Sequence, residues 1–235
     1  MSFDSKFDRK SSIGASEAAA VLGVDPYRTP YDVWLEKRGV PVADRKSPYS
    51  EAGNALEAAA AERLAKVTGW ALKDPARTYR HPAFPFLSCT PDRIIDSTHG
   101  VELKTIFSDK SAAKWGDRPP LHYEIQCRMC MAIMDAERWT IYGVRATLDP
   151  LGLEEGATDH CLTIDRDLKI ERLILADLIG WWVRHVEGGE TCPKERRERN
   201  FAGRLIGRWE AASVSEAKEA FQTSLMAFYA NGGAF

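Results

Sequence analysis

The 235-residue sequence lacks the features that would direct it to a membrane or across one. Its first residues, Met1 to Lys10, contain no apolar core of the kind that a signal peptide requires. The longest apolar run, Ile125 to Met134, is interrupted by Arg128 and is too short to span a bilayer. We therefore expect a cytoplasmic protein of a bacterial host that makes no contact with membranes.

Cysteine is scarce, and its spacing matches no cofactor site. The chain has 5 cysteines, an odd number that without a secretory signal favours reduced thiols over a disulfide framework. Cys127 and Cys130 lie within an apolar helical segment, where cysteines usually pack as small apolar side chains. The 5 histidines are not grouped with the cysteines. We expect neither an iron–sulfur cluster nor a zinc site.

An excess of one charge is also missing. The 32 Lys and Arg residues nearly balance the 34 Asp and Glu residues, for a formal net charge of -2. Taken alone, this balance speaks against a general nucleic-acid binder. It leaves open an enzyme whose acidic residues hold metal ions and whose basic residues line only a substrate path. A 44% hydrophobic composition and this length suit one well-buried globular core.

The order of the expected elements predicts an α/β fold. Helices are expected at 16–22, 30–38, 49–67, 121–134 and 167–186, several of them ended by a glycine. Segments with strand character lie at 70–79, 86–89, 92–95, 101–105, 139–145 and 160–164. This order indicates a mixed central β-sheet flanked by helices, with an N-terminal helical region.

The chain changes character after Pro193. Residues 194–199 form a charge run of the kind that is usually solvated. Ser213 and Glu216 have the spacing of a capping box, which predicts a final amphipathic helix. We expect residues 1–193 to form the main domain, and residues 194–235 to pack on it or to form an interface.

The chemically informative residues lie on two expected strands. Asp92 is followed ten residues later by Glu102, Leu103 and Lys104. Because side chains alternate across a strand, Glu102 and Lys104 share one face while Leu103 points into the core. A turn at 96–100 would fold the second strand back beside Asp92. Two carboxylates and one ammonium would then meet at one edge of a sheet.

Such a group suits metal-assisted hydrolysis of a phosphodiester. Carboxylates hold one or two Mg²⁺ ions, which polarise the phosphate and lower the pKa of an attacking water. A lysine positions or deprotonates that water and offsets charge in the transition state. The pattern alone is not specific, because an Asp followed by Glu-x-Lys on a strand arises often by chance. A solvated hairpin with one ion pair is the commoner origin of such a pattern.

Further blocks of sequence make the chain resemble a known family. In order they are Ile13–Glu17, Val21–Tyr27, Tyr31–Gly39, Gly53–Glu57, Ser88–Asp92, Val101–Thr105, Tyr123–Gln126 and Gly188–Pro193. They resemble the successive blocks of the lambda-exonuclease/YqaJ-like viral recombinase family, within the PD-(D/E)xK nuclease superfamily. The resemblance covers about residues 9–193, and it implies a restriction-endonuclease-like core and a nuclease domain at 1–193.

The resemblance also implies roles for single residues at the centre of the site. Asp92 and Glu102 match metal-binding carboxylates, and Lys104 matches the catalytic lysine. Glu57 and the backbone carbonyl of Leu103 match further metal ligands. The implied metal is Mg²⁺, for which Mn²⁺ should substitute. Without the resemblance, Glu57 would be interpreted as a solvated helix position.

Other matching positions surround this centre. Tyr123 and Gln126 share one helical face and match a pair beside the metals, although alone they would indicate only the edge of a buried helix. Arg9, Ser16 and Thr90 match residues that bind a 5′-terminal phosphate. Guanidinium and hydroxyl groups suit that ligand. Ser16 also has a structural interpretation as the N-cap of the first helix.

The implied activity is 5′-to-3′ exonuclease digestion of one strand of linear double-stranded DNA, leaving 3′ single strands and releasing 5′-phosphomonoesters. Its implied partners are DNA ends, a single-strand annealing protein and further copies of the chain in a ring-shaped homotrimer, in a phage or prophage setting. Arg28 is a candidate contact to the duplex. Two alternatives remain open: a restriction-like or junction-specific endonuclease on the same fold, and an inert relic that only binds DNA.

Overall fold

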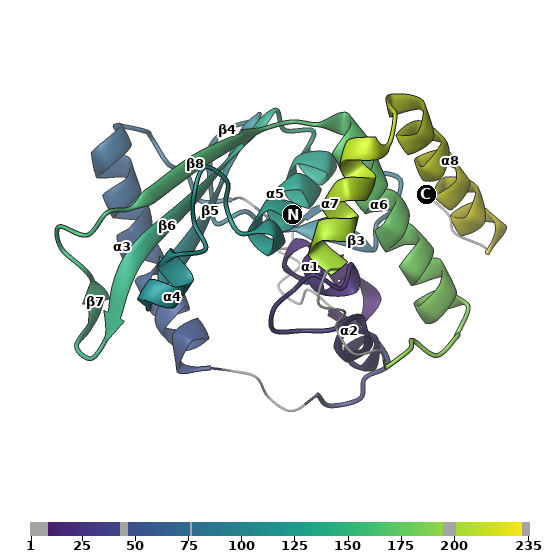
Figure 1. Ribbon diagram of the computed structural model, residues 1–235, viewed down its shortest axis with the longest axis horizontal. Helices are drawn as coiled ribbons and strands as arrows, with labels where there is room; N and C mark the ends of the chain where they lie inside the picture. Colours follow the sequence, from purple (N-terminus) through teal and green to yellow (C-terminus); the bar gives the residue numbers. More distant parts are fainter. Residues whose placement is uncertain (1–8, 43–46, 76, 195–200, 232–235) are drawn as a thin grey trace.

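A mixed β-sheet with helices on both faces organises the computed structural model (Figure 1). The structure describes residues 9–42, 47–75, 77–194 and 201–231. The strands of this sheet are β4 (Arg93–Asp96), β5 (His99–Ile106), β6 (Arg138–Leu148), β7 (Leu151–Leu153) and β8 (His160–Asp165). Strands β5 and β6 run parallel, whereas β4 is antiparallel to β5, and β7 and β8 are antiparallel to β6. The expected mixed sheet is confirmed.

A smaller sheet connects the N-terminal region to the main one. Strand β1 (Ile13–Gly14) pairs in parallel with β3 (Leu87–Cys89), and β2 (Tyr79–Arg80) pairs antiparallel with β3. A 3₁₀ turn, η1 (Arg9–Ser11), precedes β1. Strand β1 leads directly into α1 (Ala15–Val21), which is followed by α2 (Pro30–Lys37). Strand β3 ends just before Thr90 and Asp92. This small sheet therefore fixes the position of the residues that lead into β4.

Helices cover the two faces of the main sheet with different side chains. On one face, α3 (Pro48–Thr68) packs Ala60 and Leu64 against Leu103 of β5 and Tyr142 of β6. The other face meets α5 (Leu121–Met134), which joins β5 to β6 after the short helix α4 (Asp109–Ala112). Because β5 alternates, Glu102 and Lys104 lie on the α5 face and Leu103 on the α3 face. The structure thus confirms the prediction that Glu102 and Lys104 share one face of this strand while Leu103 points into the core.

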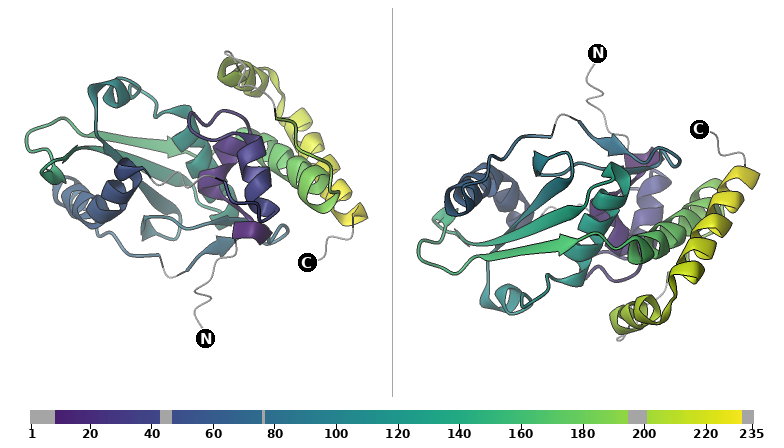
Figure 2. Two further views of the ribbon diagram at one scale, coloured as in Figure 1. Left: turned by 90° about the horizontal axis from the view of Figure 1, so that it is seen from below. Right: turned by 90° about the horizontal axis from the view of Figure 1, so that it is seen from above.

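The C-terminal helices close the core at the end of the molecule remote from α3 (Figure 2). They are α6 (Leu168–Trp182), its π-helical continuation η2 (Val183–Glu187), α7 (Phe201–Ala211) and α8 (Val214–Ala230). Phe86 stacks on Trp182 of α6 at 4.7 Å between ring centroids, and Phe228 of α8 packs against Phe86 at 5.4 Å. Ser213 accepts a hydrogen bond from the Glu216 N–H, which confirms the predicted cap. Helix α8 therefore covers the core.

Two sequence-based expectations need correction. The strand expected at 70–79 is wrong: only Tyr79 belongs to a strand, and Lys73 makes a single bridge to Ile94. Pro75 interrupts this segment and cannot donate to a ladder. Ser16 is the second residue of α1 rather than its N-cap. Gly14 holds that position, and its N–H donates to the Glu17 carboxylate at 3.0 Å.

The charge run expected at 194–199 lies, apart from its first residue, outside the described residues. Helix α7, which follows it, was not expected from the sequence. Within the described part of the chain, no helix combines the length and the apolar character needed to cross a membrane. The domain boundary at 193 stays a prediction.

The close approach of β5 and β6 requires a glycine at position 100. A Cβ atom there would lie 2.4 Å from the ring of Trp139, which is itself fully buried. We expect Gly100→Ala to lower the free energy of unfolding by about 1–3 kcal/mol, the usual cost of overpacking. Urea denaturation measures this change. Gly180→Ala in α6 is the control, since a Cβ there meets nothing within 4 Å and alanine favours a helix. Equal stability of both variants would contradict this packing.

Candidate active site

A cleft of about 1110 Å³ opens between α3 and the N-terminal helices. Most of the residues that the sequence singled out line it: Ser16, Arg28, Glu57, Asp92, Leu103, Lys104, Tyr123 and Gln126. They come from α1, the loop after it, α3, the entry to β4, β5 and α5. The fold therefore gathers residues that are more than one hundred positions apart in the sequence.

Glu102 lies beneath the floor of this cleft as a buried carboxylate. Its Oε1 accepts hydrogen bonds from Lys104 Nζ at 2.5 Å and from Gln126 Nε2 at 2.6 Å. The side chain is only 2% exposed. Its other oxygen, Oε2, is buried and has no hydrogen-bond partner in the described part of the chain. A buried, unsatisfied carboxylate oxygen is costly, so this atom is suited to a cation.

Asp92 approaches Glu102 from the entry to β4. Its Oδ2 accepts a hydrogen bond of 2.7 Å from the backbone N–H of Leu103. Burial and then the charge of Glu102 raise the pKa of Asp92 to about 7, although the charge of Lys104 and the Leu103 N–H act in the opposite direction. The site thus holds more negative charge than one ammonium neutralises. Two carboxylates with excess negative charge and one unsatisfied oxygen fit a hard divalent cation such as Mg²⁺.

Lys104 is held as an ammonium. Burial lowers the pKa of Lys104, but the charges of Glu102 and Asp92 outweigh burial and raise this pKa above its ordinary value. Its Nζ also lies 5.0 Å from the ring centroid of Tyr123, a cation–π contact. Both roles expected for this lysine stay predictions; in this structure it is a positive charge that donates a hydrogen bond to Glu102.

Glu57 lines the cleft but is not part of this cluster. Its Oε1 accepts a hydrogen bond of 2.7 Å from Arg93 Nη1. No group of three or more His, Cys, Asp and Glu side chains among the described residues is close enough to hold a metal ion. The structure thus brings Asp92 and Glu102 together, while the role of Glu57 as a further ligand stays a prediction.

Arg93 is a site residue that the sequence reasoning missed. It also pairs with Asp74 through Nε at 3.2 Å, and its side chain is only 15% exposed. Its position directly after Asp92, on an expected strand, was the available signal. Its guanidinium therefore pairs with two carboxylates, those of Glu57 and Asp74.

A second, smaller hollow of about 180 Å³ adjoins the cleft. Ser16 and Thr90 both line it, and Gln126 borders both spaces. Thr78, which was not expected, joins them, since its Oγ1 lies 2.9 Å from Oγ1 of Thr90. The structure therefore brings together two of the three residues predicted to bind a phosphate. The side chain of Arg9 lies outside the described residues.

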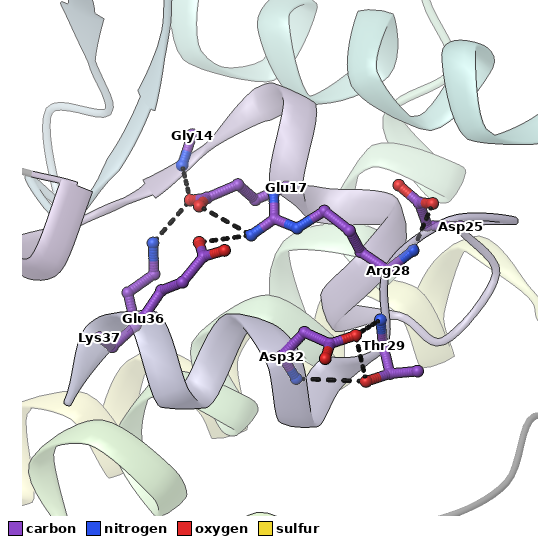
Figure 3. A network of polar contacts seen from close by, with 8 residues as sticks. All are labelled: Gly14, Glu17, Asp25, Arg28, Thr29, Asp32, Glu36 and Lys37. Carbon is purple, nitrogen blue, oxygen red and sulfur yellow. Dashed lines mark hydrogen bonds and ion pairs between the residues drawn. The ribbon is translucent and has the colours of Figure 1, made fainter. Parts of the chain in front are cut away.

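Arg28 reaches the cleft as part of a network of charges (Figure 3). Its Nη2 lies 2.5 Å from Glu36 Oε2 and 3.5 Å from Glu17 Oε1. Lys37 Nζ lies 2.7 Å from Glu17 Oε2, in a pair whose side chains are 0% and 4% exposed. This buried pair ties α1 to α2, and removing one partner would leave a buried charge. The network fixes Arg28 in the cleft wall and compensates most of its charge.

The raised pKa of Asp92 predicts how stability depends on pH in the metal-free protein. The folded state holds this proton more tightly than the unfolded chain, so the free energy of unfolding should fall as pH rises from about 4 to about 7. Asp92→Asn keeps an acceptor for the Leu103 N–H and removes the charge. We expect it to be more stable than wild type by about 1–3 kcal/mol at high pH and equally stable at low pH.

Urea denaturation in a chelating buffer, at pH values below 5 and near 8, measures this difference. Asp109→Asn, at an exposed position of α4, is the control and should leave the pH dependence unchanged. A variant Asp92→Asn that is less stable than wild type near pH 8 would show that the charged carboxylate is well compensated by the protein alone.

Solved structures with the same fold are exonucleases. The alkaline exonuclease LHK-Exo of Laribacter hongkongensis aligns with a TM-score of 0.60 and 19% identity, over 90% of this chain and 96% of that chain. A phage-related exonuclease of Haemophilus somnus 129PT aligns with a TM-score of 0.52 and 14% identity, over 94% and 96% of the two chains. At these identities the likeness concerns the fold, and it confirms the expected restriction-endonuclease-like core.

Sequence comparison places the chain more narrowly. The protein YqaJ of Bacillus subtilis (strain 168) is 27% identical over 188 residues, which are 78% of this chain and 56% of that protein. The chain thus spans about half the length of this curated relative. The YqaJ-like viral recombinase domain matches residues 6–137, more than half of the chain and including the Asp92, Glu102 and Lys104 cluster. The chain therefore belongs to the family of YqaJ-like viral recombinase domains.

Proposed function

We propose that this protein is a Mg²⁺-dependent exonuclease that digests one strand of linear double-stranded DNA from its 5′ end. One observation carries the proposal: Glu102 and Asp92 are crowded beside the single ammonium of Lys104, and Glu102 Oε2 has no partner among the described residues. Family membership and the exonuclease fold support it. The 3′ single strand that remains would serve recombination by strand annealing.

The residues present fit the metal that this activity needs. Asp92 and Glu102 would hold the ion, with the Leu103 carbonyl and Glu57 as further ligands. When bound, Mg²⁺ polarises the scissile phosphate and lowers the pKa of the attacking water, and Mn²⁺ should substitute for it. For Glu57 to bind the ion, its carboxylate would have to leave Arg93. A bound divalent cation would favour this change, because it competes with the guanidinium for the carboxylate.

The side chains around the carboxylates hold the reacting groups in place. Gln126 donates to Glu102 Oε1 and leaves Oε2 without a partner among the described residues. Lys104 stands beside Glu102 with its ammonium held over the Tyr123 ring. A positive charge fixed before the reaction stabilises negative charge that develops on the phosphate, at no cost of reorganisation.

The hollow beside the cleft supports a preference for DNA ends. Ser16, Thr78 and Thr90 line it with hydroxyl groups, and it adjoins Gln126 of the catalytic cluster. A terminal phosphate bound there would leave the next phosphodiester near Lys104. An endonuclease, which cuts away from strand ends, has no need of a site for a terminal phosphate. A protein that only binds DNA gains nothing from two carboxylates crowded against phosphate, because they repel it.

By family resemblance we extend the proposal to the assembly. The enzyme would act as a homo-oligomeric ring, a trimer, that encloses the duplex and prevents its release. A ring concentrates a modest positive potential around DNA, which would suit a chain whose formal net charge is -2. The partner that takes up the 3′ strand would be a single-strand annealing protein.

Digestion of linear duplex DNA with Mg²⁺ tests the activity. Wild type should degrade linear DNA to nucleotides with 5′ phosphates, spare closed circles and lose activity in a chelating buffer. Lys104→Ala should lower kcat by about 100- to 1000-fold, since it removes the one fixed charge of the site. Lys110→Ala, an exposed lysine on α4, is the matched control and should be as active as wild type.

The other outcomes separate the alternatives. Nicking of the circles would favour an endonuclease on the same fold. If no substrate is cut with Mg²⁺ or Mn²⁺, the protein is an inert DNA-binding relic and the proposal is wrong.

The phosphate hollow makes a separate prediction about DNA ends. Thr90→Val keeps the shape of the side chain and removes its hydroxyl, so it should weaken capture of a 5′ phosphate. We expect KM for 5′-phosphorylated linear DNA to rise about tenfold, the effect of one hydrogen bond to a charged group. KM for 5′-hydroxyl DNA should stay the same. Steady-state kinetics on the two substrates measure this, and an equal rise for both would place the phosphate elsewhere.

A further inference from the structure

Three aromatic rings lead from the mouth of the cleft to the catalytic lysine. Tyr27 lies in the loop between α1 and α2, and the next ring, His122, is 6.2 Å away with an interplanar angle of 83°. His122 lies 3.9 Å from Tyr123, and Lys104 Nζ lies over Tyr123. All three rings line the cleft. We refer to Tyr27, His122 and Tyr123 as the aromatic stack.

The outer ring of this stack is accessible although its backbone is fixed. Tyr27 is 62% exposed, which makes it one of the most exposed large apolar side chains in the described part of the chain. Its backbone N–H donates to Asp25 Oδ1 at 2.5 Å, and the N–H of Arg28 donates to the same oxygen at 2.9 Å. Asp25 is itself buried. The loop therefore presents the ring in a defined place, which lowers the entropy lost on binding a ligand.

The middle ring supports the outer one without adding charge. Burial lowers the pKa of His122 to about 4, so the imidazole is neutral at physiological pH. Its Nε2 is buried and has no hydrogen-bond partner among the described residues. His122 is thus placed by ring contacts to the two tyrosines and makes no polar bond through this nitrogen. It acts as a spacer between the exposed ring and the ring that holds Lys104.

We propose that Tyr27 is a stacking site for a nucleobase of the DNA strand that enters the cleft, and that His122 is its positioning residue. The inference rests on the proposed function only in that DNA occupies this cleft. Aromatic rings in a charged groove bind single strands by stacking, and every base offers a suitable face. The ligand is therefore an unpaired nucleotide of any sequence. Its contact with the stack would hold the strand in line with Lys104.

A binding assay without divalent metal tests the inference, because it needs no cleavage. The probe is a fluorescent linear duplex with frayed ends, and fluorescence anisotropy gives its Kd. Tyr27→Ala should raise Kd by about 5- to 150-fold, the effect of losing one base–aromatic stack, whereas Tyr27→Phe should bind like wild type. Val67→Ala is the control, since it shortens an apolar side chain of α3 that is equally exposed, 62%, and does not line the cleft.

Abasic substitution identifies the contact as stacking. Terminal nucleotides of each strand are replaced one at a time by an abasic analogue. At the position that meets the stack, wild type and Tyr27→Ala should bind with the same Kd. His122→Ala should behave like Tyr27→Ala, and His122→Phe, which keeps a ring, should restore binding. Thermal melting verifies that these variants fold.

Several results would overturn the inference. They are an unchanged Kd for Tyr27→Ala, an equal loss for Val67→Ala, or a Tyr27→Ala defect that persists on every abasic duplex. The proposed function fails by a different result. Wild type that shows the abasic-dependent contact but cuts no DNA would refute the nuclease alone. Wild type that cuts DNA, with Tyr27→Ala unchanged in binding and cleavage, would refute the stacking site alone.

Discussion

The site depends on two carboxylates that the fold places together with only one ammonium to balance them. Asp92 lies just before β4 and Glu102 lies on the adjacent strand β5, and burial prevents water from screening their repulsion. Lys104 and Gln126 satisfy one oxygen of Glu102 and leave the other without a donor in the described part of the chain. Such an arrangement costs stability in the protein alone. A divalent cation would offset the excess negative charge of the carboxylates, and the cation could then bind a phosphate. The charge pattern therefore points to phosphodiester chemistry.

The two faces of the main sheet carry different side chains, and this difference places the charged residues beside the cleft. On strand β5, Leu103 points to the α3 side, whereas its neighbours Glu102 and Lys104 point to the α5 side. The alternation of the strand thus separates an apolar core residue from the charged residues of the site. Helix α5 then supplies Gln126 and Tyr123 from consecutive turns. The close contact of Gly100 with Trp139 fixes how β5 lies against β6, and with it the position of Glu102 and Lys104.

The N-terminal wall of the cleft has a different physical basis. Besides the short pairing of β1 with β3, it is held by the buried pair of Glu17 and Lys37 and by backbone hydrogen bonds to Asp25. These bonds place Arg28 and Tyr27 at the mouth of the cleft. The wall therefore carries an exposed ring and a paired arginine, whereas the sheet side carries the buried carboxylate of Glu102 and the ammonium of Lys104.

The sequence by itself determined most of the helices, though not α4 or α7, the paired strands around the turn before Gly100, and Asp92, Glu102 and Lys104 as candidate site residues. These follow from local periodicity and from short ordered motifs. The tertiary structure decided which side chains contact one another. That Glu57 meets Arg93, that Thr78 joins Thr90, and that an exposed ring leads through His122 to the lysine depend on contacts between distant elements. Local pattern does not encode such contacts, since side-chain partners across elements are set by how helices and sheets pack. The strand expected at 70–79 is wrong because Pro75 interrupts the segment, so that Lys73 makes only a single bridge to Ile94 before Tyr79 enters β2.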